Sequence, residues 1–145
     1  MGQIIDAIQS NGFSINKLKM SRFNRQTSEQ FYAEHKNKEF FPNLQAFITS
    51  DVVIGMELVG SNAVKAWRDL IGPTNTLTAK AEAPQSLRSL FGTDGTKNAV
   101  HGSDTLGSYK REHDFWFAGE EPELRPMQTT AVLDNCSLCL IKPHI

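Results

Sequence analysis

The sequence predicts an α/β (α+β) domain, and three observations lead to this expectation. The chain has 145 residues, which is enough for one compact domain with a buried core. Hydrophobic residues make up 39% of it and charged residues 21%, as in an ordinary globular protein. Segments with helical spacing of apolar residues alternate along the chain with shorter β-like segments. This alternation predicts helices packed on a sheet.

The first expected elements differ in their apolar spacing. Ile4, Ile5 and Ile8 have the spacing of one helix face. The β-like segment over residues 13–20 shifts its alternation after Ile15, which is typical of a β-bulge. In order, we expect a helix over 3–10, a strand over 13–20, a helix from the N-cap Asn24 to about Lys36, a helix over 40–48 and a buried strand over 51–58.

The second half of the chain begins with capping signals and ends in an apolar strand. Ser61 is expected to cap a helix that Gly72 and Pro73 terminate. Residues 118–135 contain prolines and acidic residues without an apolar period, which is typical of a linker. Between and after these segments we expect a loop over 73–83, a short helix over 84–91 that starts at Pro84, a turn over 92–95, a strand over 98–101, a helix over 105–117 and a strand over 136–141.

Charge and hydropathy exclude two classes of partner. The formal net charge is −1, so no strong positive field would attract a nucleic-acid backbone nonspecifically. No apolar run approaches the roughly 20 residues that cross a bilayer. The N-terminus lacks the basic stretch and long apolar core of a signal peptide. We therefore expect a cytoplasmic protein.

The two cysteines, Cys136 and Cys139, have the spacing of a redox or zinc motif. A structural zinc ion needs about four ligands, and the sequence has no second cysteine pair. In the expected strand, residues three apart point to opposite faces of the sheet. The pair is therefore interpreted as structural packing, and no metal ligands are predicted.

Residues 98–104 form the most informative motif, Asn-Ala-Val-His-Gly-Ser-Asp. It closely resembles the N-x-x-H-G-S-D signature of nucleoside diphosphate kinases. The resemblance covers about residues 2–117, and its supporting context occurs in the family's order. That context comprises Tyr32, Phe40 and Phe41, Arg68, residues 72–75, residues 86–92 and Glu112 within 111–117.

The resemblance implies a phosphotransfer centre built on His101. In this family the histidine takes the γ-phosphate from a nucleoside triphosphate and passes it to a nucleoside diphosphate. Imidazole is a nucleophile at neutral pH, and a carboxylate on its far nitrogen fixes the tautomer that attacks. Glu112 would be that carboxylate, and Tyr32 would lie near the nucleophile.

The same resemblance implies a set of nucleotide ligands. Arg68, Thr74 and Arg88 would hold the phosphates, together with Lys142, and Mg²⁺ would arrive with the nucleotide. Asn98 would bind the sugar hydroxyl and Phe40 would stack on the base. Without this context, the two arginines would be interpreted as solvated helix charges and Phe40 as part of the core.

The resemblance also implies a ferredoxin-like fold, with a four-stranded antiparallel sheet and helices mainly on one face. The family's first strand ends in a Lys-Pro-Asp-like motif and is missing at this N-terminus, yet residues 136–145 resemble it and contain Lys142-Pro143-His144. The chain is therefore interpreted as part of a tandem protein or as a circular permutant. We predict a kinase-like domain over 1–117, a linker over 118–135 and a strand from 136 that completes the centre of the sheet, in its own chain or in a partner's.

Two main functions stay open at this point. The first is a nucleoside diphosphate kinase with a phosphohistidine intermediate, which the family residues favour. The second is a non-catalytic scaffold of ciliary or centrosomal microtubules, because the altered termini resemble divergent tandem members of the family. A metal-dependent nuclease using His35, His101 and Asp104 has little support. The expected partners are nucleoside di- and triphosphates, further copies of the chain in a dimer or hexamer, and ciliary or microtubule proteins, with no membrane and no specific nucleic acid.

Overall fold

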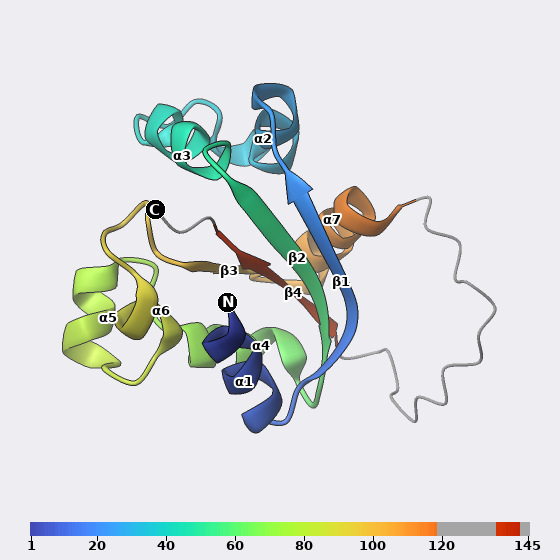
Figure 1. Ribbon diagram of the computed structural model, residues 1–145, viewed down its shortest axis with the longest axis vertical. Coiled ribbons are helices and arrows are strands. Elements are labelled where there is room, and N and C mark those ends of the chain that lie inside the picture. The colour runs from blue at the N-terminus through green and yellow to red at the C-terminus, as the bar shows by residue number, and fades with distance from the viewer. Residues whose placement is uncertain (119–135, 143–145) are drawn as a thin grey trace.

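Four antiparallel strands form a single sheet in the order β1-β2-β4-β3 (Figure 1). The computed structural model describes residues 1–118 and 136–142. The strands are β1 (Ser14–Arg22), β2 (Val52–Val59), β3 (Val100–Gly102) and β4 (Cys136–Ile141). The C-terminal strand β4 thus lies between β2 and β3 of its own chain, with Met56 opposite Cys139. The linker expected over 118–135 lies outside the described residues from position 119, and the division into domain and linker stays a prediction.

Eight helical segments accompany the sheet in the described part of the chain. Asn24 caps α2 as expected, since its side-chain oxygen accepts a hydrogen bond from the Thr27 amide at 2.8 Å. That helix is shorter than predicted and gives way to a 3-10 turn. The segments are α1 (Gly2–Ser10), α2 (Arg25–Phe31), η1 (Ala33–His35), α3 (Phe41–Ile48), α4 (Ala63–Ile71), α5 (Thr76–Glu82), α6 (Leu87–Phe91) and α7 (Leu106–Phe117).

One expected cap and one expected loop are wrong. Asn62, in the left-handed region with φ 49°, precedes α4, and its side chain makes no cap hydrogen bond. The segment over 73–83 contains α5, whose cap Asn75 accepts from the Leu77 amide at 2.8 Å. A helix of seven residues is too short to show a clear apolar period, so Asn75 was its main sequence signal.

The short helix α6 also starts later than expected. It begins at Leu87 rather than Pro84, and the side chain of Ser86 caps it by accepting from the Ser89 amide at 3.4 Å. The bulge predicted in the first strand is confirmed, because the register of β1 against β2 shifts between Ile15 and Lys17. Most boundaries therefore follow local side-chain chemistry.

Helices cover both faces of the sheet, and the expectation that they lie mainly on one face is wrong. Ile54, Met56 and Leu58 of β2 belong to a buried cluster with α1 and α4. Val53 belongs to a second cluster with α2, α3 and α7. Figure 1 shows α1 and α4 on one side of the sheet and α7 on the other. Because both sides are covered, β2 is buried along almost its whole length.

Cys139 packs in the core of the α4 side. Its thiol is free and buried, and burial raises its pKa well above the usual value. The packing interpretation is confirmed for this residue. Among residues 1–118 and 136–142, no three His, Cys, Asp or Glu side chains are grouped to hold a metal ion. None of the helices in this part of the chain is both long and apolar enough to cross a membrane.

Candidate active site

A cavity of about 550 Å³ opens beside β3, between the α2–α3 segment and the region of α4 to α6. Residues far apart in the sequence meet there. For example, β3 pairs with β4, so His101 of β3 and Lys142 at the end of β4 both reach the cavity. All nine residues nominated from the sequence line this cavity. They are Tyr32, Phe40, Arg68, Thr74, Arg88, Asn98, His101, Glu112 and Lys142.

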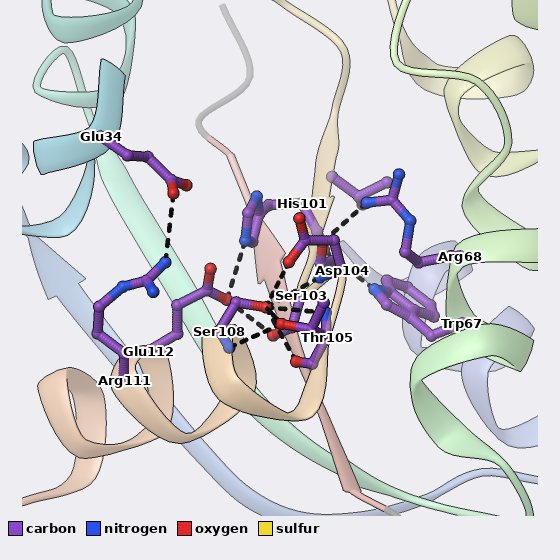
Figure 2. A network of polar contacts seen from close by, with 12 residues as sticks. Glu34, Trp67, Arg68, His101, Ser103, Asp104, Thr105, Ser108, Arg111 and Glu112 are labelled. Carbon is purple, nitrogen blue, oxygen red and sulfur yellow. Dashed lines mark hydrogen bonds and ion pairs between the residues drawn. The ribbon is translucent and has the colours of Figure 1, made fainter. Parts of the chain in front are cut away.

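At the centre of the cavity, the imidazole of His101 faces a buried carboxylate (Figure 2). Its Nε2 lies 3.0 Å from Oε2 of Glu112, which is only 4% exposed. The hydroxyl of Ser103 donates to the same oxygen at 2.7 Å. An ionised carboxylate only accepts hydrogen bonds, so this contact keeps the proton on Nε2 and leaves the lone pair on Nδ1. The arrangement prepares Nδ1 as a nucleophile.

Backbone packing fixes the strand that carries His101. Trp67 Nε1 donates to the carbonyl oxygen of His101 at 3.0 Å. A Cβ added to Gly102 would lie 2.6 Å from the Trp67 ring, so only glycine fits. Ala99 just before the strand has φ 67°, a left-handed conformation that is costly for a residue with a side chain. Its carbonyl accepts from the Lys142 amide at 2.9 Å, which joins β3 to the end of β4.

The buried guanidinium of Arg88 is committed to the protein backbone. It donates to the carbonyl of Val100 at 3.1 Å and to that of Gly72 at 2.9 Å, and it reaches Thr74 Oγ1 at 3.4 Å. Burial lowers its pKa to about 10, and the nearby charge of Arg68 adds to the effect. Arg88 of α6 therefore binds both the loop between α4 and α5 and strand β3 at the wall of the cavity, a structural task that its sequence position did not reveal.

Lys142 supplies a second buried cation. Its Nζ donates to Oδ1 of Asn98 at 2.7 Å, and the Asn98 amide donates in turn to the Thr74 carbonyl at 3.1 Å. Burial lowers the pKa of Lys142 to about 7, the charge of Arg88 lowers it further, and Asp94 acts in the opposite direction. An anion in the cavity would stabilise the charged form of Lys142, which burial and Arg88 disfavour.

The other end of the cavity is mainly aromatic. Phe40 is 47% exposed, and its ring centroid lies 5.6 Å from that of His35. Tyr32 is buried with its ring 6.3 Å from the His101 ring, and burial raises its pKa well above the usual value. Its hydroxyl has no hydrogen-bond partner within the described residues. A planar ring could stack on Phe40 while the Tyr32 hydroxyl donates to a ligand.

Sequence reasoning missed several contributors to this site. Ser103, which donates to Glu112, was not nominated as a site residue. Its position in the motif, two residues after His101, is the sequence signal that could have identified it. Asp104, named from the sequence only for the nuclease alternative, also lines the cavity, and its carboxylate accepts from the Ser108 hydroxyl at 2.6 Å. At the rim, Arg111 of α7 and Glu34 approach to 3.6 Å and join two distant elements (Figure 2). The last contact has no local sequence signal.

Comparisons with known proteins agree with this fold and motif. The family model described as "Nucleoside diphosphate kinase" matches residues 1–122. The chain is 43% identical over 146 residues to the rat protein "Nucleoside diphosphate kinase homolog 7". This alignment covers 99% of this chain and 36% of the rat protein. It is also 41% identical over 121 residues to the nucleoside diphosphate kinase of Aquifex aeolicus, covering 83% of this chain and 85% of that one. This chain belongs to the nucleoside diphosphate kinase family.

Solved structures support the fold directly. The Aquifex aeolicus nucleoside diphosphate kinase superposes with a TM-score of 0.80 at 41% identity, over 83% of this chain and 86% of that chain. A halophilic nucleoside diphosphate kinase from Halobacterium salinarum, solved in complex with CDP, superposes with a TM-score of 0.76 at 32% identity. This match covers 83% of this chain and 79% of that chain. The predicted family and the ferredoxin-like α/β fold are thus confirmed. The chain spans about a third of the length of the rat and mouse homolog 7 proteins.

Proposed function

We propose that the protein is a nucleoside diphosphate kinase that moves a γ-phosphate through a phosphohistidine at His101. The observation that carries this proposal is the 3.0 Å contact between His101 Nε2 and the buried Glu112. A cation-lined cavity around the pair suits a polyphosphate, and the similar Halobacterium salinarum enzyme was solved with CDP. The terminal phosphate of a nucleoside triphosphate is the substrate that such a cavity accommodates best.

In the proposed reaction, Nδ1 of His101 attacks the γ-phosphorus and the nucleoside diphosphate leaves with the bridging oxygen. The phosphorylated ring gains positive charge, which the ionised Glu112 stabilises through Nε2–H. A second nucleoside diphosphate then attacks the phosphorus with a terminal oxygen and restores the free imidazole. Ser103 keeps the carboxylate in place through its 2.7 Å hydrogen bond.

The other nominated residues would bind and orient the nucleotide. Arg68 and Lys142 would neutralise phosphate oxygens, and Thr74 would donate its hydroxyl to them. Arg88 would act mainly through the loops that it holds. Asn98 would bind the sugar, in addition to its contact with Lys142.

At the aromatic end, Phe40 would stack on the base. The unpartnered hydroxyl of Tyr32 would donate to a phosphate oxygen.

Magnesium fits this site as a companion of the nucleotide. Among the described residues no carboxylate cluster is present to bind the bare ion, and several side chains facing the cavity are cations. Phosphate oxygens and water would hold Mg²⁺, and the ion would neutralise phosphate charge. Asp104 is the carboxylate of the motif that lines the cavity. The protein's own contribution is the orientation of the phosphate chain against His101.

Labelling with γ-³²P-ATP and magnesium tests the proposal. The protein should acquire an acid-labile, base-stable phosphate that it returns to added nucleoside diphosphate. His101→Ala should abolish the label while circular dichroism shows an unchanged fold. His35→Ala, a histidine in the wall of the same cavity, is the matched control and should keep the label. A label that persists in His101→Ala would contradict the proposed nucleophile.

A scaffold function is the second candidate, because the relatives of this chain include the proteins called homolog 7 and homolog 5 as well as bacterial nucleoside diphosphate kinases. On the family resemblance we also propose assembly into dimers or hexamers, a cytoplasmic location and an association with ciliary or centrosomal microtubules. Light scattering after size exclusion measures the assembly, and co-sedimentation with microtubules measures the association. A folded wild-type protein that is never phosphorylated but sediments with microtubules would favour the scaffold.

A further inference from the structure

A buried carboxylate outside the cavity binds the helix that carries Glu112. Glu57 lies in the apolar strand β2 and is 4% exposed. Burying a carboxylate costs several kcal/mol unless hydrogen bonds compensate it, so its partners indicate what it does. Its Oε2 accepts from Asn16 Nδ2 of β1 at 2.5 Å. Its Oε1 accepts from the Tyr109 hydroxyl at 2.7 Å and lies 3.2 Å from His113 Nε2.

The two oxygens of Glu57 therefore serve different elements. Oε2 faces the neighbouring strand, whereas both contacts of Oε1 are made with α7. Tyr109 and His113 are four residues apart, so they lie one above the other on the same face of the helix. One oxygen atom thus holds two adjacent turns of α7 against the middle of the sheet.

Glu112 lies between these two contacts along the helix. An α-helix turns about 100° per residue, so Glu112 projects from a neighbouring face, toward His101. Its carboxylate is about 5–6 Å from the helix axis, and a roll of about 10° would move it by roughly 1 Å. That displacement takes a 3.0 Å contact beyond hydrogen-bond range. Misplacement of catalytic groups by about 1 Å can cost on the order of a hundredfold in rate.

Apolar packing alone restrains such a roll less well. Trp116, one turn further along α7, packs on Gly55 of β2, where an added Cβ would meet the ring at 2.5 Å. A flat ring on a glycine can slide, whereas hydrogen bonds are directional. The contacts at Glu57 therefore supply a directional restraint at the middle of α7. They add to the Arg111–Glu34 contact at the rim and to the Lys19 Nζ bond with the Trp116 carbonyl at 3.2 Å.

We propose that Glu57 is a positioning residue, which holds α7 through Tyr109 and His113 so that Glu112 stays within hydrogen-bond range of His101. This inference rests on the proposed phosphotransfer for its effect on rate. Its geometric part concerns only the tautomer and orientation of the His101 ring. The two parts can be measured separately.

The test is the double variant Tyr109→Phe/His113→Phe, which removes both donors to Oε1 and keeps the aromatic packing of α7. Single-turnover phosphorylation of His101 should slow roughly tenfold to a hundredfold. The dissociation constant for the nucleotide should change less than about threefold, because no phosphate or base ligand is altered. In ¹⁵N NMR spectra, the His101 ring should change from one tautomer, protonated on Nε2, to a mixture.

Two further variants separate positioning from stability and from charge. Asn16→Ala removes the contact to Oε2, so it should lower the free energy of unfolding while the tautomer and the phosphorylation rate stay close to wild type. Glu57→Gln keeps an oxygen acceptor for Tyr109 and His113, and should retain the rate within about threefold.

Several outcomes would overturn the inference. These are an unchanged rate and tautomer in the double variant, an equal rate loss in Asn16→Ala, or an equal loss in Glu57→Gln. If wild type is never phosphorylated but the double variant still mixes the tautomers, the positioning stands and the proposed kinase function fails.

Discussion

Nucleotide binding should bring a proton onto Lys142. In the free protein its ammonium group is buried against Asn98, and burial followed by the charge of Arg88 lowers its pKa to about 7. A polyphosphate beside Nζ would favour the charged form and raise that pKa toward its ordinary value. At pH 8 only about one tenth of the free molecules carry this proton, so binding should take up about 0.9 proton.

The sign of the pH dependence follows from this linkage. The nucleotide prefers protonated Lys142. The affinity of the protein for the nucleotide should therefore be greatest below pH 7 and fall about tenfold for each pH unit above 7. Stability changes in the opposite direction, because between pH 7 and about 10.5 the unfolded chain binds more protons at this residue than the folded protein. The free energy of unfolding should therefore rise by about 2 kcal/mol from pH 7 to pH 9.

Titration calorimetry measures the uptake. ADP would be titrated at pH 8 in two buffers of different ionisation enthalpy, with Lys142→Met as the control that keeps an apolar stem of similar length. The difference in proton uptake between wild type and this variant should be close to 0.9. Urea unfolding of both proteins at pH 7 and pH 9 should show the rise in the free energy of unfolding with pH only in wild type. Equal uptake in the two proteins would refute the reasoning.

Three other substitutions probe the site and its supports. Glu112→Gln should slow His101 phosphorylation by about 10²–10⁴-fold with little change in nucleotide affinity, since it disturbs tautomer control; a parallel loss of affinity in calorimetry would contradict this. Arg88→Ala should lower the free energy of unfolding by about 2–4 kcal/mol without nucleotide, because carbonyls lose a charged donor; urea melts that match wild type would show otherwise. Gly55→Val should cost about 1–3 kcal/mol through overlap with Trp116, visible in thermal melts and tryptophan fluorescence, and an unaltered melting temperature would count against this packing.

The elements predicted well from the sequence are those with a clear apolar pattern or a strong cap. The 12-residue helix α7 has three turns on which to show its buried side, and Asn24 marks the start of α2 by its side-chain chemistry. The seven-residue helix α5 has less than two complete turns, so its pattern resembles a loop. The near-continuous apolar run of β2 revealed burial but not which residues face which layer.

The candidate site divides in a similar way. The motif over residues 98–104 is contiguous, so His101 could be recognised without knowledge of the fold. By contrast, Glu57 is 52 residues from Tyr109, and no local pattern links them. The contacts of Arg88 with backbone carbonyls are equally invisible, because a carbonyl has no residue type. Sequence reasoning nominated side chains that line the cavity and missed those that hold them in place.

The central position of β4 has a consequence for how the molecule acquires its structure. Every pair between β4 and β2 joins residues 77 to 87 positions apart, as at Met56 and Cys139. Strand β2 therefore depends on a strand much later in the sequence to cover its inner edge. Until residues 136–142 pair with it, that edge is open to pairing with other molecules. We expect the pairing of β4 with β2 to be slow for this reason, and it brings Lys142 to the cavity when the sheet becomes continuous.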